Sequence, residues 1–191
     1  MLKVVKEFFS SSAKELKVTQ NLAICAMMAA LSIVLSYTTS IAITPEIRVG
    51  FSGIPNRIVD FLFGPITGAI FGGMMDILKF LIKPTGAFFF GYTLSAMLAS
   101  FIYGVFLYKR PFRPFRMLLN ILLAEILVKL LINCCLNTLW SSMMGGKAFM
   151  VLLKPRLIKN LIQIPVDTTI LYFVLTLFQR LRRYLLPNKN K

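Results

Sequence analysis

Positively charged side chains lie at both ends of the apolar segments of this chain, although the orientation of a membrane protein requires them at one end only. Basic clusters at residues 3–17, 109–116 and 180–191 fit the rule that cytoplasmic flanks are rich in lysine and arginine. Other cations fall near the opposite ends: Arg48, Arg57, Lys83, Lys147, Lys154, Arg156 and Lys159. Because topology does not require them there, we interpret them as groups that capture an anionic ligand from the outer side.

The apolar segment at residues 117–140 carries a row of polar residues that recur every four positions: Glu125, Lys129, Asn133, Asn137 and Ser141. A step of four drifts by about 40° on an α-helix, so the row faces the protein interior. The inner pair, Glu125 and Lys129, is interpreted as a structural ion pair. Asn133 and Asn137 offer donors and acceptors that suit the edge of a heterocycle. Trp140 offers either a stacking face or an anchor at the membrane interface.

The last apolar segment, residues 150–178, has one polar face: Arg156, Asn160, Gln163 and Asp167. Lipid-facing positions do not favour such residues, so we assign this face to a functional site. Lys154 and Lys159 flank the face, and Pro165 is expected to kink the helix.

The segment around residues 64–82 combines small residues with charges. Gly64, Gly68 and Gly72 recur every four residues, which favours close helix packing. Asp76 and Lys79 are three residues apart and can pair on one helix face, for a structural or a functional purpose. The loops and short segments add further candidates to the site: Arg48, Asn56, Arg57 and Lys83. The outer halves together predict an aromatic, amide-rich and cationic cavity for a flat ligand with carboxylates.

Composition places the chain in a membrane. Of 191 residues, 57% are hydrophobic, and the mean hydropathy is +0.75. A spanning helix takes roughly 20 residues, so the length allows about six spans. The net charge of +15 is gathered in clusters that flank helices, which argues against a nucleic-acid partner and for contact with anionic lipid.

The predicted fold is therefore an all-α integral membrane protein with six transmembrane helices, a short second helix and both termini cytoplasmic. The expected spans are residues 21–43, 54–65, 66–82, 88–108, 117–140 and 150–178. Gly64-Pro65 ends the short second segment. The domain boundaries are a basic amphipathic segment at 1–19 on the cytoplasmic membrane surface, a membrane domain at 20–184 and a basic tail at 185–191. The loops at 44–53, 83–87 and 141–149 then lie outside.

The sequence contains no pattern that favours an enzyme. It has no histidine, and we find no nucleophile–base pair, metal-ligand cluster or phosphate-binding loop. We therefore predict no cofactor and no metal, and any active transport needs an ATPase on another chain. Ala26 and Ala30 form a small-residue strip that by itself indicates helix packing.

These features together resemble the substrate-binding S component of energy-coupling factor (ECF) vitamin transporters. More specifically, four stretches resemble the folate-specific S component: IRVGFSGIPNRI at 47–58, KPTGAFFFGYTLSAML at 83–98, LNTLW at 136–140 and RLIKNLIQIPV at 156–166. The resemblance implies a high-affinity vitamin receptor of the bacterial cell membrane that docks on a transmembrane coupling subunit with two cytoplasmic ATPases. It also implies that Ala26 and Ala30 form the docking strip and that the protein delivers its ligand by reorienting in the membrane.

The resemblance suggests how folate would be held. The pterin is expected against Asn133, Asn137, Trp140, Asn160 and Gln163. The glutamate carboxylates would meet Arg48, Arg57, Lys83 or Lys154. Three alternatives stay open: an S component for another vitamin such as riboflavin or thiamine, a small membrane protein that handles an anionic lipid headgroup, and an assembly protein without a small ligand.

Overall fold

The computed structural model describes residues 2–38, 40–42, 48–84, 87–109, 113–146 and 148–185. The regular secondary structure of this part is helical apart from two three-residue strands, which agrees with the predicted all-α class. The elements in chain order are α1 (Leu2–Glu15), α2 (Thr19–Thr38), β1 (Ser40–Ala42), β2 (Arg48–Gly50), the 3-10 turn η1 (Phe51–Gly53), α3 (Ile54–Ile82), α4 (Phe90–Leu107), α5 (Pro114–Leu127), the π-helix η2 (Val128–Leu136), α6 (Asn137–Gly145) and α7 (Phe149–Leu185). β1 and β2 pair antiparallel, with Ser40 opposite Gly50.

Five helical stretches in the described residues are long and apolar enough to cross a membrane: Thr19–Thr38, Phe51–Ile82, Phe90–Leu107, Pro114–Gly145 and Phe149–Arg180. The protein is therefore a multi-pass membrane protein. The stretch that contains α3 is the most buried of the five, and α2 and α7 are the least buried. The first span ends at Thr38 rather than at residue 43, because the chain turns into β1.

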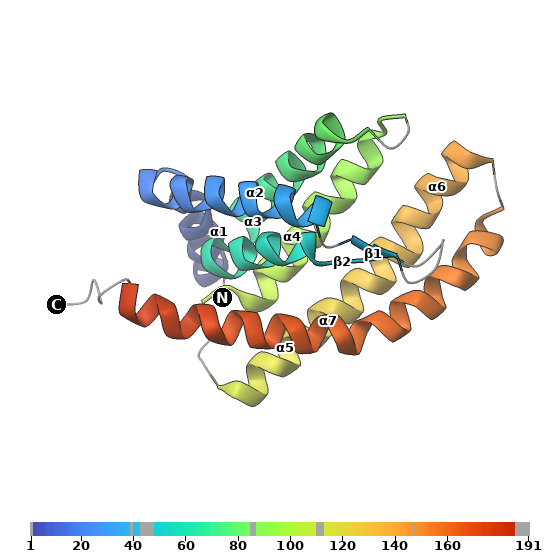
Figure 1. The fold of residues 1–191 in the computed structure, drawn as a ribbon. Helices are drawn as coiled ribbons and strands as arrows, with labels where there is room; N and C mark the ends of the chain where they lie inside the picture. The colour runs from blue at the N-terminus through green and yellow to red at the C-terminus, as the bar shows by residue number, and fades with distance from the viewer. Residues whose placement is uncertain are drawn as a thin grey trace.

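The two segments predicted on either side of Gly64 belong to one broken helix, α3. Gly64 adopts φ 85° and ψ −170°, a conformation open to glycine, and Pro65 follows it. The two arms fold back on each other. They lie so close that a side chain at Gly68 would collide with Asp60 across the bend. Figure 1 shows both arms meeting near α1. The predicted break at Gly64-Pro65 is thus confirmed.

Helix α1 packs against this bend rather than only along a membrane surface, which the sequence did not indicate. Ser12 is fully buried, and its Oγ donates to the Phe63 carbonyl oxygen at 2.7 Å. Ser12 Oγ also accepts hydrogen bonds from the backbone N–H groups of Ile66 at 3.1 Å and Thr67 at 3.3 Å. Thr67 Oγ1 in turn donates to the Ser12 carbonyl at 2.6 Å. Ser12 thereby satisfies backbone groups at the broken helix that lipid could not satisfy.

We expect Ser12→Ala to lower the thermal stability of the purified protein. The substitution leaves buried backbone groups without partners, at a cost of about 1–3 kcal/mol. Ser10→Ala is the matched control, because Ser10 is exposed on the same helix. A thermal melt followed by fluorescence in detergent compares the two variants. Equal melting temperatures for them would contradict the structural role of Ser12.

The predicted span at 117–140 is not one regular α-helix. It consists of α5, η2 and α6, and the middle part has π-helical hydrogen bonding from Val128 to Leu136. A π-helix holds more residues per turn than an α-helix. The drift expected for residues four apart is therefore reduced, and this row of polar residues keeps one direction. Helix α7, in contrast, is continuous through Pro155 and Pro165, and the kink expected at Pro165 stays a prediction.

The positions of the helix ends bear on the membrane topology of the chain. Figure 1 shows α1, the end of α4, the start of α5 and the end of α7 toward the left, and the α6–α7 connection on the right. The basic clusters of the sequence adjoin the elements on the left.

Candidate ligand-binding site

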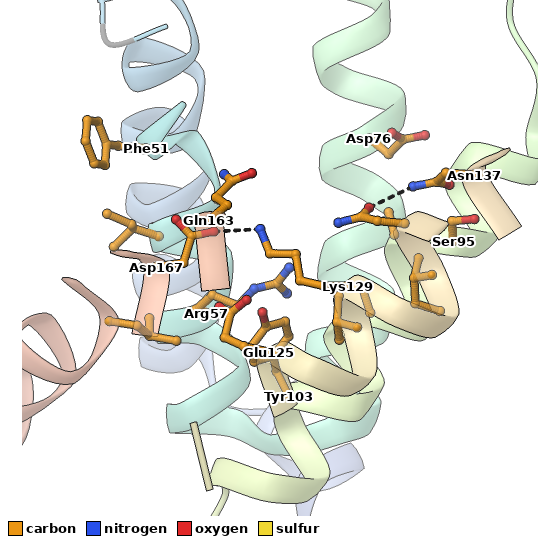
Figure 2. A pocket seen from close by; sticks show the side chains of 18 of the residues that line it. Phe51, Arg57, Asp76, Ser95, Tyr103, Glu125, Lys129, Asn137, Gln163 and Asp167 are labelled. Carbon is orange, nitrogen blue, oxygen red and sulfur yellow. Dashed lines mark hydrogen bonds and ion pairs between the residues drawn. The ribbon is translucent and has the colours of Figure 1, made fainter. Parts of the chain in front are cut away.

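A cavity of about 360 Å³ lies between α3, α4, η2 and α7, and we call it the central cavity. Four of the predicted site residues line it: Arg57, Asn133, Asn137 and Gln163. Figure 2 shows Arg57 from α3, Lys129 from η2 and Asp167 from α7 converging on the same space. The structure thus brings together residues that are more than 100 positions apart in the chain.

Arg57 is held in place by its neighbours. Its Nη1 lies 3.0 Å from Asp60 Oδ2 and 3.5 Å from Ser100 Oγ. The guanidinium stacks 3.7 Å from the centroid of the Tyr103 ring. An arginine so restrained keeps its orientation in the cavity wall, and its charge is largely balanced by Asp60.

Lys129 crosses the cavity to pair with Asp167, with 2.7 Å between Nζ and Oδ2. The expected ion pair of Lys129 with Glu125 is therefore wrong: Lys129 takes its partner from α7. Glu125 lines the cavity and is only 4% exposed. Lys129 thus joins η2 to α7 across the central cavity.

The amide wall is ordered by one internal hydrogen bond. Asn137 Nδ2 donates to Asn133 Oδ1 at 3.1 Å, as Figure 2 shows with a dashed line. Asn137 Oδ1 has no hydrogen-bond partner in the described residues. Within the described residues, these two side chains therefore leave an acceptor on Asn137 and donors on Asn133 unused.

Trp140 and Asn160 lie behind the wall instead of in it, within the described part of the structure. Trp140 Nε1 donates to Ser95 Oγ at 3.1 Å, and its ring packs 5.4 Å from that of Phe89. Asn160 is 6% exposed, and its Nδ2 lies 3.2 Å from Cys134 Sγ. Both residues brace the elements that carry the cavity wall.

Arg156, Lys154 and Asn56, which the structure describes, do not line the central cavity. Arg156 joins α7 to α6 through Ser141 Oγ at 2.6 Å and Thr138 Oγ1 at 3.3 Å. Lys154 is exposed, and Asn56 Oδ1 lies 3.3 Å from Ser32 Oγ. The side chain of Arg48 and the whole of Lys147 lie outside the described residues.

A second cavity of about 490 Å³ lies at the α3–α4 connection, and we call it the loop cavity. Lys79, Lys83 and the ring of Phe88 line it, and Asp76 and Tyr92 line both cavities. The two cavities therefore adjoin.

The charges at the loop cavity are arranged differently from the prediction. Asp76 and Lys79 do not form an ion pair in the structure. Asp76 Oδ2 accepts from Thr93 Oγ1 at 2.8 Å, and Lys79 Nζ donates to the Ser52 carbonyl at 3.1 Å. Lys83 lies 5.6 Å from the centroid of the Tyr37 ring. In the described residues, neither lysine has an acidic partner within ion-pair distance.

Sequence reasoning missed the contribution of α4. Tyr92, Ser95, Ala99 and Tyr103 all line the central cavity. Their spacings of three, four and four residues put them on one helix face. Two tyrosines and a serine on one face of an otherwise apolar span were the available signal.

The alanine strip faces outward. Ala26 and Ala30 are exposed on α2, and Met27 beside them is 63% exposed. Cys25 and Met28 face the core instead. The strip is thus available to another helix rather than used inside this protein.

Comparison with known proteins agrees with this architecture. The family described as "ECF transporter, substrate-specific component" matches residues 20–175. The protein named "Folate transporter FolT" from Clostridium novyi is 38% identical over 156 residues, covering 82% of this chain and 88% of its own length. A protein of the same name from Leuconostoc mesenteroides is 32% identical over 162 residues, covering 82% and 85%. The solved structure titled "Crystal structure of FolT bound with folic acid" superposes with a TM-score of 0.71 at 32% identity, over 82% of this chain and 93% of that one. The chain therefore belongs to the family of substrate-specific components of ECF transporters.

Proposed function

We propose that this protein is the folate-binding S component of an ECF-type importer. The observation that carries the proposal is a pair of adjoining cavities whose charges differ, in a chain related to proteins named as folate transporters. The protein itself is a substrate-binding subunit and not an enzyme, so ATP hydrolysis falls to partner chains.

The two cavities match the two halves of folate. In the central cavity the cations Arg57 and Lys129 are each balanced by a carboxylate, and amides line the wall. Such a wall suits the neutral pterin, which carries both donors and acceptors. The loop cavity presents Lys79 and Lys83 beside aromatic rings, which suits the aminobenzoyl group and the glutamate carboxylates. Both volumes fall in the range of about 300–1,000 Å³ typical of ligand sites.

This arrangement shifts the carboxylate site away from part of the predicted set. Arg57 is engaged by Asp60, and Lys154 lies outside both cavities in the described residues. Lys83 keeps its predicted role, and Lys79 joins it. Arg48 remains a candidate, because its strand leads into η1, which borders the central cavity.

We expect Lys83→Ala to weaken folate binding by about ten-fold, the cost of one charge-assisted hydrogen bond. Binding of a pterin that lacks the aminobenzoyl-glutamate tail should stay within about two-fold of the wild type, because that ligand does not extend into the loop cavity. Isothermal titration calorimetry on the purified protein measures both ligands. Arg48→Ala is tested in the same way.

Lys154→Ala is the matched control, since it removes a lysine that is exposed on α7. It should leave both affinities unchanged. Equal losses for folate and the tail-less pterin in Lys83→Ala would place the carboxylates elsewhere.

In the membrane, we assign six crossings to the chain by counting the two arms of α3 separately. Both termini and the basic clusters then face the cytoplasm and its anionic lipid, and the α3–α4 and α6–α7 connections face outward. In this orientation, and in the bacterial plasma membrane, the cavities are accessible to folate from the outer side. A transmembrane coupling subunit with two cytoplasmic ATPases is the partner that this family requires. Reorientation in the membrane then delivers the ligand.

Other ligands suit the cavities less well. Thiamine is cationic, and the unpaired lysines of the loop cavity would repel it. The ring system of riboflavin has a single ring N–H and no carboxylate, so it leaves the two lysines without an anionic partner and can pair with only one acceptor of the central cavity. An anionic lipid headgroup could meet the lysines and would leave the amide wall empty.

A further inference from the structure

We infer that Glu125 accepts hydrogen bonds from the donor edge of the bound heterocycle, where an amino group adjoins a ring N–H. This inference rests on the proposed folate-binding function and adds a specificity-determining residue to it. The ligand chemistry concerned is a 2-amino-4-oxopyrimidine, the outer ring of a pterin.

The position of Glu125 fits the far end of the ligand. Asp76 lines both cavities and marks their junction. Figure 2 shows Glu125 and Tyr103 at the opposite end of the central cavity from Asp76. If the carboxylates occupy the loop cavity, the pterin enters the central cavity with its aminopyrimidinone ring foremost. That ring therefore reaches Glu125.

The hydrogen bonding of Glu125 is incomplete without a ligand. The side chain is 96% buried, and its Oε2 atom has no hydrogen-bond partner in the described residues. A buried acceptor without a partner costs about 1–3 kcal/mol, and more when it is charged. The terminal torsion of a glutamate is broad, so the carboxylate can turn toward a donor in the cavity without leaving its rotamer.

The other acceptors of the central cavity match two parallel donors less well. One oxygen of Asp76 is taken by Thr93, and one oxygen of Asp167 by Lys129. The free acceptor of Asn137 is a neutral amide oxygen next to its own NH2 group. A carboxylate accepts two parallel N–H groups in the fork geometry known from arginine pairs. Among the described carboxylates that line the central cavity, Glu125 is the buried one that can offer this geometry.

The test compares two ligands that differ at the amino group only. Folate and its analogue with a 2-methyl group in place of the 2-amino group are titrated into the purified protein by calorimetry. We expect the wild type to prefer folate by at least about ten-fold, because the analogue leaves the acceptor unpaired. Glu125→Gln should lose most of its folate affinity and bind both ligands within about two-fold of each other, because its amide puts a donor against the ligand's donors.

Asp76→Asn is the matched control, since it neutralises a carboxylate at the other end of the cavity. It should keep the preference of the wild type for folate, even if both affinities fall. A wild type that binds both ligands equally, or a Glu125→Gln protein that keeps the full preference, would overturn the inference while the proposed function stands. The wild-type comparison decides the matter if Glu125→Gln does not fold. A wild type that binds neither ligand would instead remove the proposed function.

Discussion

Replacing Ala26 and Ala30 together with leucine is expected to abolish folate uptake by cells and to leave folate binding by the purified protein unchanged. Both alanines are exposed on α2, so larger side chains there do not disturb the core of this protein. Alanines four apart let a partner helix approach closely, and two added isobutyl groups would hold that helix away. Uptake of radiolabelled folate in cells and calorimetry on purified protein measure the two activities separately.

Leu161→Trp is the control for bulk on a lipid-facing surface, because Leu161 on α7 is 72% exposed. It should leave uptake and binding intact. If the double alanine variant lost binding together with uptake, the strip would be part of the fold and not a docking surface.

Gly104→Ala is expected to cause a large loss of folded protein. A glycine-to-alanine change inside a helix ordinarily stabilises by about 1 kcal/mol. At Gly104, however, the new Cβ would overlap the backbone of Pro65 at the bend of α3, and backbone cannot move aside like a side chain. Overpacking of this kind costs about 1–3 kcal/mol or more. The measurement is the yield of monodisperse protein by size-exclusion chromatography, with a thermal melt.

Gly53→Ala is the matched control, because nothing lies within 4 Å of the position of its Cβ. It should leave yield and melting temperature unchanged. A Gly104→Ala protein as stable as the Gly53→Ala protein would show that α3 and α4 have more room at the bend than the structure indicates.

Local signals in the sequence predicted much of this fold. Gly64-Pro65 breaks α3 because glycine alone readily adopts the required backbone angles and proline cannot continue the hydrogen-bond ladder. The polar row on α5, η2 and α6 and the polar face of α7 could be predicted because such residues do not face lipid. Both features depend on spacing along one segment, which a single sequence shows.

Features that depend on contacts between distant segments could not be predicted in this way. Ser12 is one of three consecutive serines, and nothing near it in the chain shows that it pairs with the bend at Gly64. Lys129 has an acidic neighbour one turn away in Glu125 but pairs with Asp167, 38 residues further on. Local spacing suggested the wrong partner because the tertiary fold brings a closer one.

The candidate site was predicted in part for the same reason. The faces that carry Asn133, Asn137 and Gln163 were identified, and the structure places these residues in the central cavity. Trp140 and Asn160 share those faces, but the packing of α4 and η2 takes them behind the wall. Spacing along a helix indicates which side faces inward, and only the packing of neighbours decides which inward residues meet a ligand.

Titration of the purified, ligand-stripped protein with folate by isothermal titration calorimetry is the most direct test of folate binding. Quenching of Trp140, the single tryptophan, is followed in parallel, because its Nε1 is bonded to Ser95 in the cavity wall. We expect saturable binding of one folate per chain that neither riboflavin nor thiamine displaces. A protein that melts cooperatively but gives no heat with folate would contradict the proposed function.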